Sequence, residues 1–127
     1  MSFRFDPRGH LIIVPARLYR GNRPETARLA LDTGATRTVV SQEVALSLGY
    51  EPSALQERVR IITGSGAMSV HLLNVDTIKA LGREATNMRV LCYTLPTSAR
   101  IDGVLGLDFL RDTRLVIDFR AGLLTLE

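Results

Sequence analysis

Short apolar segments separated by glycine and proline clusters are the feature that most constrains how this chain folds. Segments of about four to eight residues rich in Val, Ile and Thr are typical of β-strands, because branched side chains pack well on a pleated surface. The segments expected to be strands are Leu11–Val14, Ala16–Tyr19, Ala27–Leu31, Thr38–Val40, Glu57–Thr63, Met68–Leu73, Val75–Leu81, Thr86–Tyr93, Leu115–Phe119 and Leu123–Leu126. So many short strands predict an all-β domain, built as a barrel or a sandwich.

Glycines and prolines mark the expected turns between these strands. Gly64-Ser65-Gly66 separates two strand segments and predicts a hairpin with a flexible tip. Gly82-Arg83 and Arg120-Ala121-Gly122 predict two further hairpins, while Thr94–Arg100 is expected to be a loop around Pro96. Most strands are therefore expected to pair within hairpins.

Two short helices are expected among the strands. Ser41 can cap the first, Glu43 lies in its first turn, and Gly49 ends it. The apolar stripe of this helix consists of Val44, Ala45 and Leu48. Leu107–Arg111 is expected to form one or two further helical turns. Helices this short leave the all-β class unchanged.

The length of 127 residues predicts a single domain spanning residues 1–127. Residues 1–10 are polar and mixed, so they are expected to form a loose N-terminal segment. Cys92 is the only cysteine, which excludes an internal disulfide and favours a reducing, cytoplasmic location. No apolar run approaches the roughly 18 residues that span a bilayer, so no membrane association is expected.

The net charge of +3 arises from arginines spread along the whole sequence, with Lys79 as the only lysine. A positively charged chain can bind nucleic acid, but such a surface usually gathers its charges in clusters. The arginines here run from Arg4 to Arg120 with no cluster and no aromatic residues interleaved. We therefore expect a solvated surface and no nucleic-acid partner.

An acidic turn at Leu31–Thr36 is the clearest candidate for chemistry. Asp32 follows an apolar segment and precedes Thr33, Gly34 and Ala35. Gly34 permits a tight backbone that a ligand or partner can approach, and the Thr33 hydroxyl can fix the turn. Taken alone, Asp-Thr-Gly is a weak motif, expected by chance in on the order of a few per cent of chains this long. An Asp that only hydrogen-bonds its own loop has the same local pattern.

A second motif, about seventy residues later, gives this turn its context. Ile101–Leu110 holds an Asp-Gly turn, an apolar pair and a glycine that precede a short helix. With the Asp32 turn before it and a glycine-tipped hairpin between them, this order resembles the retropepsin-like aspartic proteases. The resemblance covers the chain from Leu11 to its end. It implies a retropepsin-like closed barrel with one lobe per chain, and peptidase activity.

The resemblance also implies roles for individual residues. Asp32 resembles the catalytic aspartate, and Thr33 the residue whose hydroxyl joins the two active-site turns of a dimer. Gly34 and Ala35 resemble the rest of this active-site loop. The segment expected to pack behind the loop is Gly103, Val104, Leu105 and Gly106, and the expected flap tip is Gly64, Ser65, Gly66 and Met68.

Two features depart from the retroviral members of this family. Those enzymes place an arginine after the motif glycine, where this chain has Leu107, so the ion pair of that arginine is not expected here. Cellular relatives, such as the protease-like domain of the DNA-damage-inducible shuttle proteins, are more similar to this Gly-Leu-Asp version. A hairpin also follows the short helix in place of a single terminal strand, so a dimer sheet is expected to be built differently.

A single Asp-Thr-Gly implies two chains. Peptide hydrolysis by this chemistry needs two carboxylates that share one proton, because like charges about 3 Å apart cannot both ionise. A two-fold homodimer would bring Asp32 to its own copy. His10 and His71 lie in no nucleophile motif, and the sequence has no His-x-x-x-His or Cys-x-x-Cys spacing. Neither a covalent nucleophile nor a metal or other cofactor is therefore expected.

Other polar candidates are interpreted as structural. Asp102 is an alternative second acid within the chain, but Asp-Gly is a turn signal, which favours a structural role. Asp108 is expected to stabilise the first turn of the short helix. Asp118 is expected to be the polar member of an alternating strand, and Cys92 a small buried hydrophobic residue.

An extended polypeptide is the expected substrate, its backbone paired with the flap and with the strand near the active-site loop. Ala35, Val39 and Met68 are expected to line apolar pockets for its side chains. The alternative is a non-catalytic dimeric peptide-binding module that keeps the same fold, since fold does not establish function. The intact motif at Asp32 favours the peptidase, because a binding module has no need of an acid there.

Overall fold

Ten strands and two short α-helices make up the fold, which a computed structural model describes for residues 1–54, 57–95 and 100–127. The strands are β1 (Ser2–Arg4), β2 (Ile13–Arg20), β3 (Arg23–Leu31), β4 (Val39–Val40), β5 (Arg58–Thr63), β6 (Gly66–Ala80), β7 (Arg83–Cys92), β8 (Gly103–Leu105), β9 (Leu115–Asp118) and β10 (Leu123–Leu126). The helices are α1 (Gln42–Ser47) and α2 (Leu107–Leu110), with one 3-10 turn, η1 (Pro52–Ala54). The predicted all-β class is confirmed. The predicted loop around Pro96 lies largely outside the described residues.

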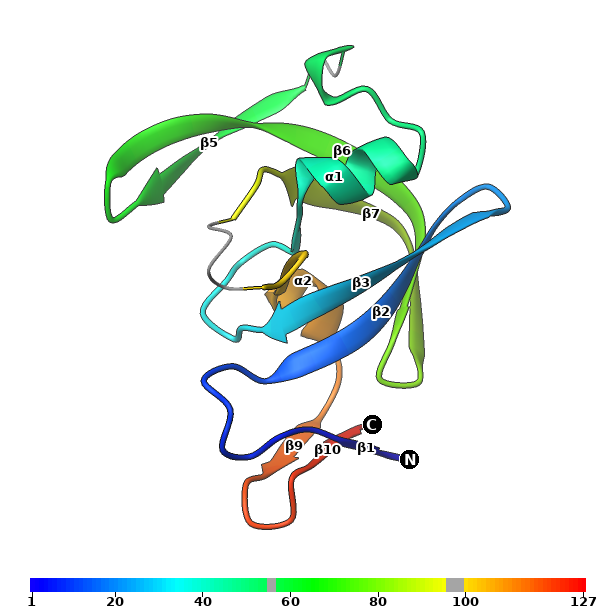
Figure 1. The fold of residues 1–127 in the computed structure, drawn as a ribbon, viewed down its shortest axis with the longest axis vertical. Coiled ribbons are helices and arrows are strands. Elements are labelled where there is room, and N and C mark those ends of the chain that lie inside the picture. The colour runs from blue at the N-terminus through cyan, green and yellow to red at the C-terminus, as the bar shows by residue number, and fades with distance from the viewer. Residues whose placement is uncertain (55–56, 96–99) are drawn as a thin grey trace.

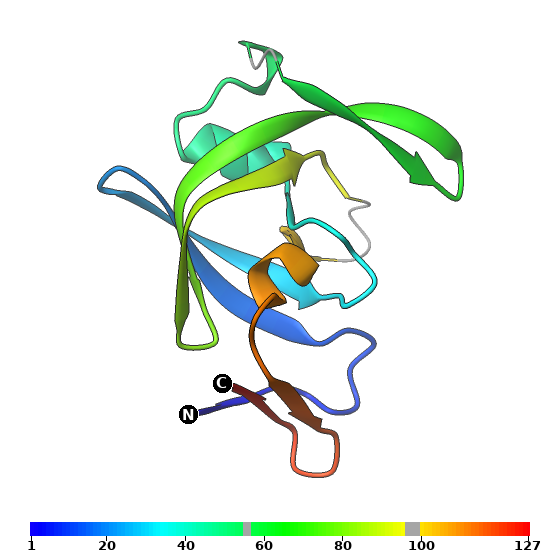
Figure 2. The same cartoon turned by 180° about the vertical axis from the view of Figure 1, so that it is seen from behind.

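A closed barrel of six strands forms the body of the molecule (Figures 1 and 2). Its order is β2-β3-β8-β4-β7-β6, and β6 closes the ring by pairing with residues 17–19 of β2. Most neighbours are antiparallel, but β8 runs parallel to β3, and β4 runs parallel to β7. β5 continues this sheet beyond the ring by pairing with the first half of β6. The predicted closed barrel is therefore present.

Two strands are longer than the sequence predicts. β6 runs without a break through Asn74, where the sequence suggests two separate strands. Asn74 stays in the ladder opposite Arg89 and is exposed, so its polar side chain costs little at this position. β2 likewise continues through Pro15, which pairs with Arg28 of β3. On its other side β2 pairs with β6 only at residues 17–19, so at Pro15 that edge is open and the absence of an N–H group is tolerated.

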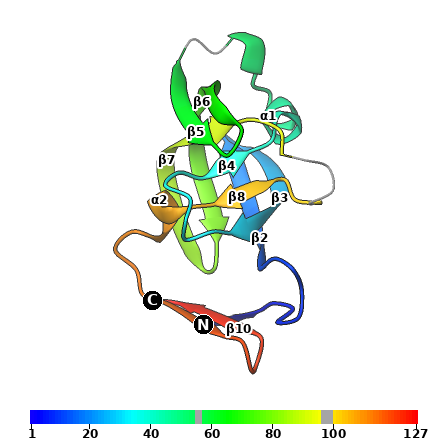
Figure 3. The ribbon, with the colours of Figure 1, turned by 90° about the vertical axis from the view of Figure 1, so that its left-hand side faces the viewer.

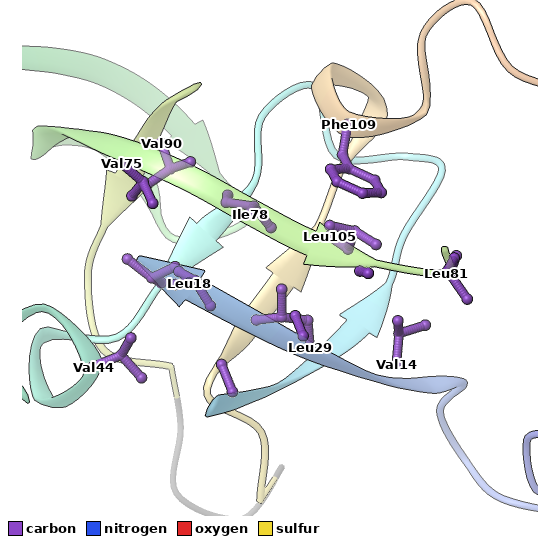
Figure 4. Close-up of a cluster of buried hydrophobic side chains, with 14 of the residues drawn as sticks. Val14, Leu18, Leu29, Val44, Val75, Ile78, Leu81, Val90, Leu105 and Phe109 are labelled. Atoms are coloured by element: carbon purple, nitrogen blue, oxygen red, sulfur yellow. The ribbon is translucent and has the colours of Figure 1, made fainter. Parts of the chain in front are cut away.

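Aliphatic side chains from nearly every barrel strand fill the interior (Figure 4). Leu18 of β2, Leu29 of β3 and Ile78 of β6 are fully buried. Leu105 of β8 and Phe109 of α2 join them. A smaller cluster beside this core consists of Val39, Val70, Leu72 and Leu91. Burial of each large side chain contributes roughly 1.5–3 kcal/mol, so this core gives the loops around Asp32 a rigid support.

The two ends of the chain form a separate three-stranded sheet of order β1-β10-β9 (Figure 3). Phe5, just after β1, is buried and donates its N–H to the carbonyl oxygen of Gly122 at 3.0 Å. Its ring packs edge-on against Phe119, with 5.7 Å between ring centres. The expectation of a loose segment over residues 1–10 is therefore wrong for residues 2–5, which are ordered. Pairing with the far end of the chain orders them, and nothing in the local sequence indicates that partner.

Both predicted helices are present. The hydroxyl of Ser41 caps α1 by accepting the N–H of Val44 at 3.2 Å, and Gly49 follows the helix with a φ of 87°. α2 is a single turn with Asp108 in it. Within the described part of the chain, no helix has the length and apolar character needed to cross a membrane.

Candidate active site

Asp32 is the first residue after β3, at the point where the chain leaves the barrel for a loop. Its N–H donates to the carbonyl oxygen of Leu105 at 3.0 Å, which fixes the start of the loop against β8. Its carboxylate Oδ1 accepts the N–H of Gly34 at 2.8 Å, while Oδ2 has no hydrogen bond to the described residues. Asp32, Thr33 and Gly34 are all exposed. The carboxylate is therefore oriented by its own turn and open to solvent or to a partner.

Residues 103–106 pack against this loop through two glycines. A Cβ on Gly103 would overlap the carbonyl oxygen of Val39. A Cβ on Gly106 would lie 2.8 Å from the carbonyl oxygen of Ala35 and 2.8 Å from the carbonyl carbon of Arg37. Real Cβ atoms do not approach so closely, so both positions require glycine. The backbone of the second motif thus lies against the backbone of the acidic turn.

The residues between these glycines complete the support. Val104 lies opposite Ala30 of β3 and Val39 of β4 and so joins the strands on either side of the loop. Leu105 is fully buried in the core. The N–H of Leu107 donates to the carbonyl oxygen of Ala35 at 2.8 Å. This is the position where retroviral enzymes carry an arginine, and here its backbone holds the loop.

A hydrogen-bond network that the sequence did not predict joins Thr38 to Asp108. The Thr38 side chain is fully buried, and its hydroxyl donates to Oδ1 of Asp108 at 2.7 Å. The Thr38 N–H also donates to that carboxylate, and the Thr38 Oγ1 accepts the N–H of Gly106 at 3.1 Å. Asp108 Oδ1 accepts the N–H of Phe109 as well, at 2.9 Å, so its expected role in the first turn of α2 holds. The available signal was a threonine in the otherwise apolar run 38–40.

The hairpin of β5 and β6 extends well beyond the barrel (Figures 1 and 2). Its tip lies at Gly64 and Ser65, and Gly66 has a φ of 116°, which favours glycine. The Ser65 N–H and the Gly66 carbonyl both bond to the hydroxyl of Thr63, which closes the turn. Ile62, next to this tip, is 88% exposed. The hairpin expected between the two motifs is therefore present, and it carries an uncovered apolar side chain.

A pocket of about 470 Å³ lies between β5 and the loop that follows Asp32. Its lining residues are Gly34, Ala35, Thr36, Arg37, Val39, Val59, Arg60, Ile61, Ile62, Leu91 and Tyr93. Two of the three residues expected to line side-chain pockets, Ala35 and Val39, are among them. Met68 is not: it pairs with Ile61 in the hairpin and is partly exposed. The two arginines of this lining were not identified from the sequence.

The remaining candidates have structural roles. Asp102 Oδ2 accepts the N–H of Arg28 at 2.8 Å, which ties the turn before β8 to β3. Asp118 Oδ1 accepts the N–H groups of Arg120 and Ala121 in the terminal hairpin. Cys92 is buried with a free thiol, and burial raises its pKa from 9.0 to about 11. None of the three contributes to the loop around Asp32.

Comparisons with known proteins place the chain in a family. The profile of the aspartyl protease family matches residues 14–109, which is most of the chain. The chain therefore belongs to the aspartyl protease family and is an aspartic peptidase. No curated protein matches the sequence.

A solved structure supports the same fold. The chain is similar to the crystal structure of a retropepsin-like aspartic protease from Rickettsia conorii, with a TM-score of 0.75 and 20% sequence identity. The match covers 99% of this chain and 88% of that chain. At this identity the likeness concerns the fold, and it confirms the retropepsin-like resemblance predicted from the two motifs.

Proposed function

We propose that this peptidase is a homodimeric endopeptidase that cleaves extended polypeptides, with Asp32 of each chain supplying one catalytic carboxylate. The exposed position of Asp32 carries this proposal. Its Oδ1 is held by Gly34, while Oδ2 is free, on a loop braced from behind by two glycines. A single lobe offers one such carboxylate, and this chemistry needs two, so a second copy is the simplest source of the other.

The proposed mechanism follows from two such carboxylates facing each other. They share one proton, so one is a base and the other an acid. The ionised carboxylate takes a proton from water as the water attacks the scissile carbonyl. The protonated carboxylate hydrogen-bonds the carbonyl oxygen and later supplies a proton to the leaving nitrogen. The Gly34 N–H on Oδ1 keeps each carboxylate oriented for these transfers.

The exposed neighbours of Asp32 fit the same dimer. Thr33 is exposed beside Asp32, and we assign its hydroxyl to the contact between the two loops. The outer edge of β5 is unpaired in the described sheet, so the flap can add a substrate strand through backbone hydrogen bonds. Ile62 would then cover the substrate instead of facing water. A reducing, cytoplasmic compartment suits the one unpaired thiol, Cys92.

The test compares wild type with Asp32→Asn on a complex peptide library at pH about 4 to 7, the range in which shared-proton pairs work. Mass spectrometry maps the cleaved bonds. Asp112→Asn is the matched control, because Asp112 is exposed, lies after α2 and makes no hydrogen bond to the loop among the described residues. We expect cleavage by wild type and by the control, and none by Asp32→Asn. Equal cleavage by all three would refute the assignment of Asp32, and no cleavage by a confirmed dimer would favour a peptide-binding module.

A further inference from the structure

We propose that the pocket between β5 and the active-site loop selects substrates with an acidic side chain, Glu or Asp, which Arg37 and Arg60 bind together. This inference rests on the proposed function, because it concerns the side chain of a peptide bound beside Asp32. Arg37 belongs to the loop that follows Asp32, and Arg60 belongs to β5 of the flap hairpin. Arg60 is exposed and alternates along β5 with Val59 and Ile61, which pack on the barrel, so it contributes from the rim of the pocket, while Arg37 contributes from the loop.

The polar side chains of this pocket suit an anion. The lining residues with polar side chains are Thr36, Arg37, Arg60 and Tyr93, each of which can donate a hydrogen bond, and no lining residue carries a carboxylate. The other side chains are apolar: Ala35, Val39, Val59, Ile61, Ile62 and Leu91. Such a site accepts the methylene stem of an acidic residue on its apolar wall and the carboxylate at its donors. A neutral or basic side chain would leave these donors without an acceptor.

Both arginines are available for a ligand. The ion pairs among the described residues are Lys79–Glu84, Arg89–Glu57 and Arg114–Glu127, and none involves Arg37 or Arg60. Neither guanidinium makes a hydrogen bond within the described part of the chain. Arg37 is half-buried as a residue, and its guanidinium has no carboxylate partner among the described residues. A carboxylate provides that partner, and hydrogen bonds between charged groups are stronger than neutral ones.

The pocket has the size and place of a side-chain site. Its volume of about 470 Å³ falls within the range of ligand pockets. Gly34 and Ala35, two and three residues after Asp32, form one side of it. A substrate strand between the flap and the loop would therefore place one of its side chains here, near the bond to be cut.

The experiment uses pairs of peptides that differ only in Glu or Gln at a position near the cleaved bond. Wild type is expected to cleave the Glu peptide with a kcat/KM roughly 10-fold higher, a modest ratio because Arg60 is exposed and screened. The double variant Arg37→Gln with Arg60→Gln is expected to bring the ratio close to one. Arg37→Lys with Arg60→Lys retains the charge and is expected to keep part of the preference. The control is Arg58→Gln, because Arg58 is exposed on the same strand but does not line the pocket.

The outcomes separate this inference from the proposed function. Two results would overturn the acidic selection and leave the proposed peptidase activity intact. In the first, wild type cleaves the peptides with no preference for Glu at any position. In the second, the double Gln variant retains the preference. If wild type cleaves neither peptide, fluorescence anisotropy with Asp32→Asn measures binding of the same labelled pairs. Tighter binding of the Glu peptide that is lost in the arginine variants would support the selection even though catalysis had failed. Equal binding of both peptides would overturn it.

Discussion

The hydroxyl of Thr38 lies 2.7 Å from the carboxylate Oδ1 of Asp108, although 70 residues separate the two in the sequence. This contact joins the far end of the active-site loop to α2. The same hydroxyl accepts the N–H of Gly106, so one buried threonine connects the loop, the glycine motif and the helix. Asp32 at the near end is tied to Leu105 of the same motif. The loop is therefore held at both ends by the segment 105–108.

Replacement of Thr38 by valine tests this network. Val has nearly the same shape but cannot donate to Asp108 or accept from Gly106. We expect the free energy of unfolding to fall by roughly 2–3 kcal/mol, because buried polar groups lose their partners. Peptide cleavage should fall too, since the far end of the loop around Asp32 loses both hydroxyl bonds and keeps only the backbone N–H bond of residue 38 to Asp108.

Urea unfolding and peptide cleavage, each measured against Thr86→Val, check this expectation. Thr86 is an exposed threonine of β7, so its replacement should change neither property appreciably. If Thr38→Val has the same free energy of unfolding as Thr86→Val, the hydrogen bonds of the Thr38 hydroxyl contribute little to stability.

Gly103→Ala should be far more damaging than Gly64→Ala. The added methyl group at 103 would overlap the backbone carbonyl of Val39 and crowd the buried side chain of Leu29, and a backbone carbonyl within the sheet cannot easily move aside. At Gly64 the methyl group meets nothing within 4 Å. We expect Gly103→Ala to cost more than about 3 kcal/mol or to prevent folding, and Gly64→Ala to change stability by less than about 0.5 kcal/mol. Thermal unfolding of the two variants measures the difference, and similar melting temperatures would contradict the close packing described here.

The contrast between Gly103 and Thr38 explains how much the sequence could predict. Gly103 stands beside the apolar pair Val104-Leu105, and this short motif can be read from neighbouring residues in the sequence. Together with the Asp32 turn before it, the motif predicted the correct fold and the candidate active-site loop. The Thr38–Asp108 and Phe5–Gly122 contacts, and the presence of Arg37 and Arg60 around one pocket, all depend on residues brought together by the completed fold. The residues next to each of these positions in the sequence do not indicate which distant residue it will contact.

The buried thiol of Cys92 should make stability depend on pH in alkaline solution. Burial raises its pKa from 9.0 to about 11, so the folded state holds this proton more tightly than the unfolded state does. The contribution to stability is therefore complete below pH about 9 and is lost as the pH rises toward about 11, by on the order of 2 kcal/mol. Urea unfolding of wild type and Cys92→Ala over this range isolates the effect, because all other titrating groups are shared. The stability difference between them should be constant below pH about 9 and change above it; two parallel curves would contradict the prediction.

A mixture of wild type with the Asp32→Asn chain tests the assembly of the site from two copies. If each active centre needs Asp32 from both chains, random pairing of equal amounts leaves about one dimer in four with two aspartates. At a fixed wild-type concentration well above the dissociation constant, added Asp32→Asn chain should therefore reduce cleavage to about half, because half of the wild-type chains pair with the inactive one. The Asp112→Asn chain, added in the same amount, should not reduce cleavage, since it supplies an intact Asp32. A rate unaffected by the Asp32→Asn chain would mean that one lobe is sufficient or that the chains do not exchange, and pre-mixing the two chains in urea before refolding distinguishes these cases.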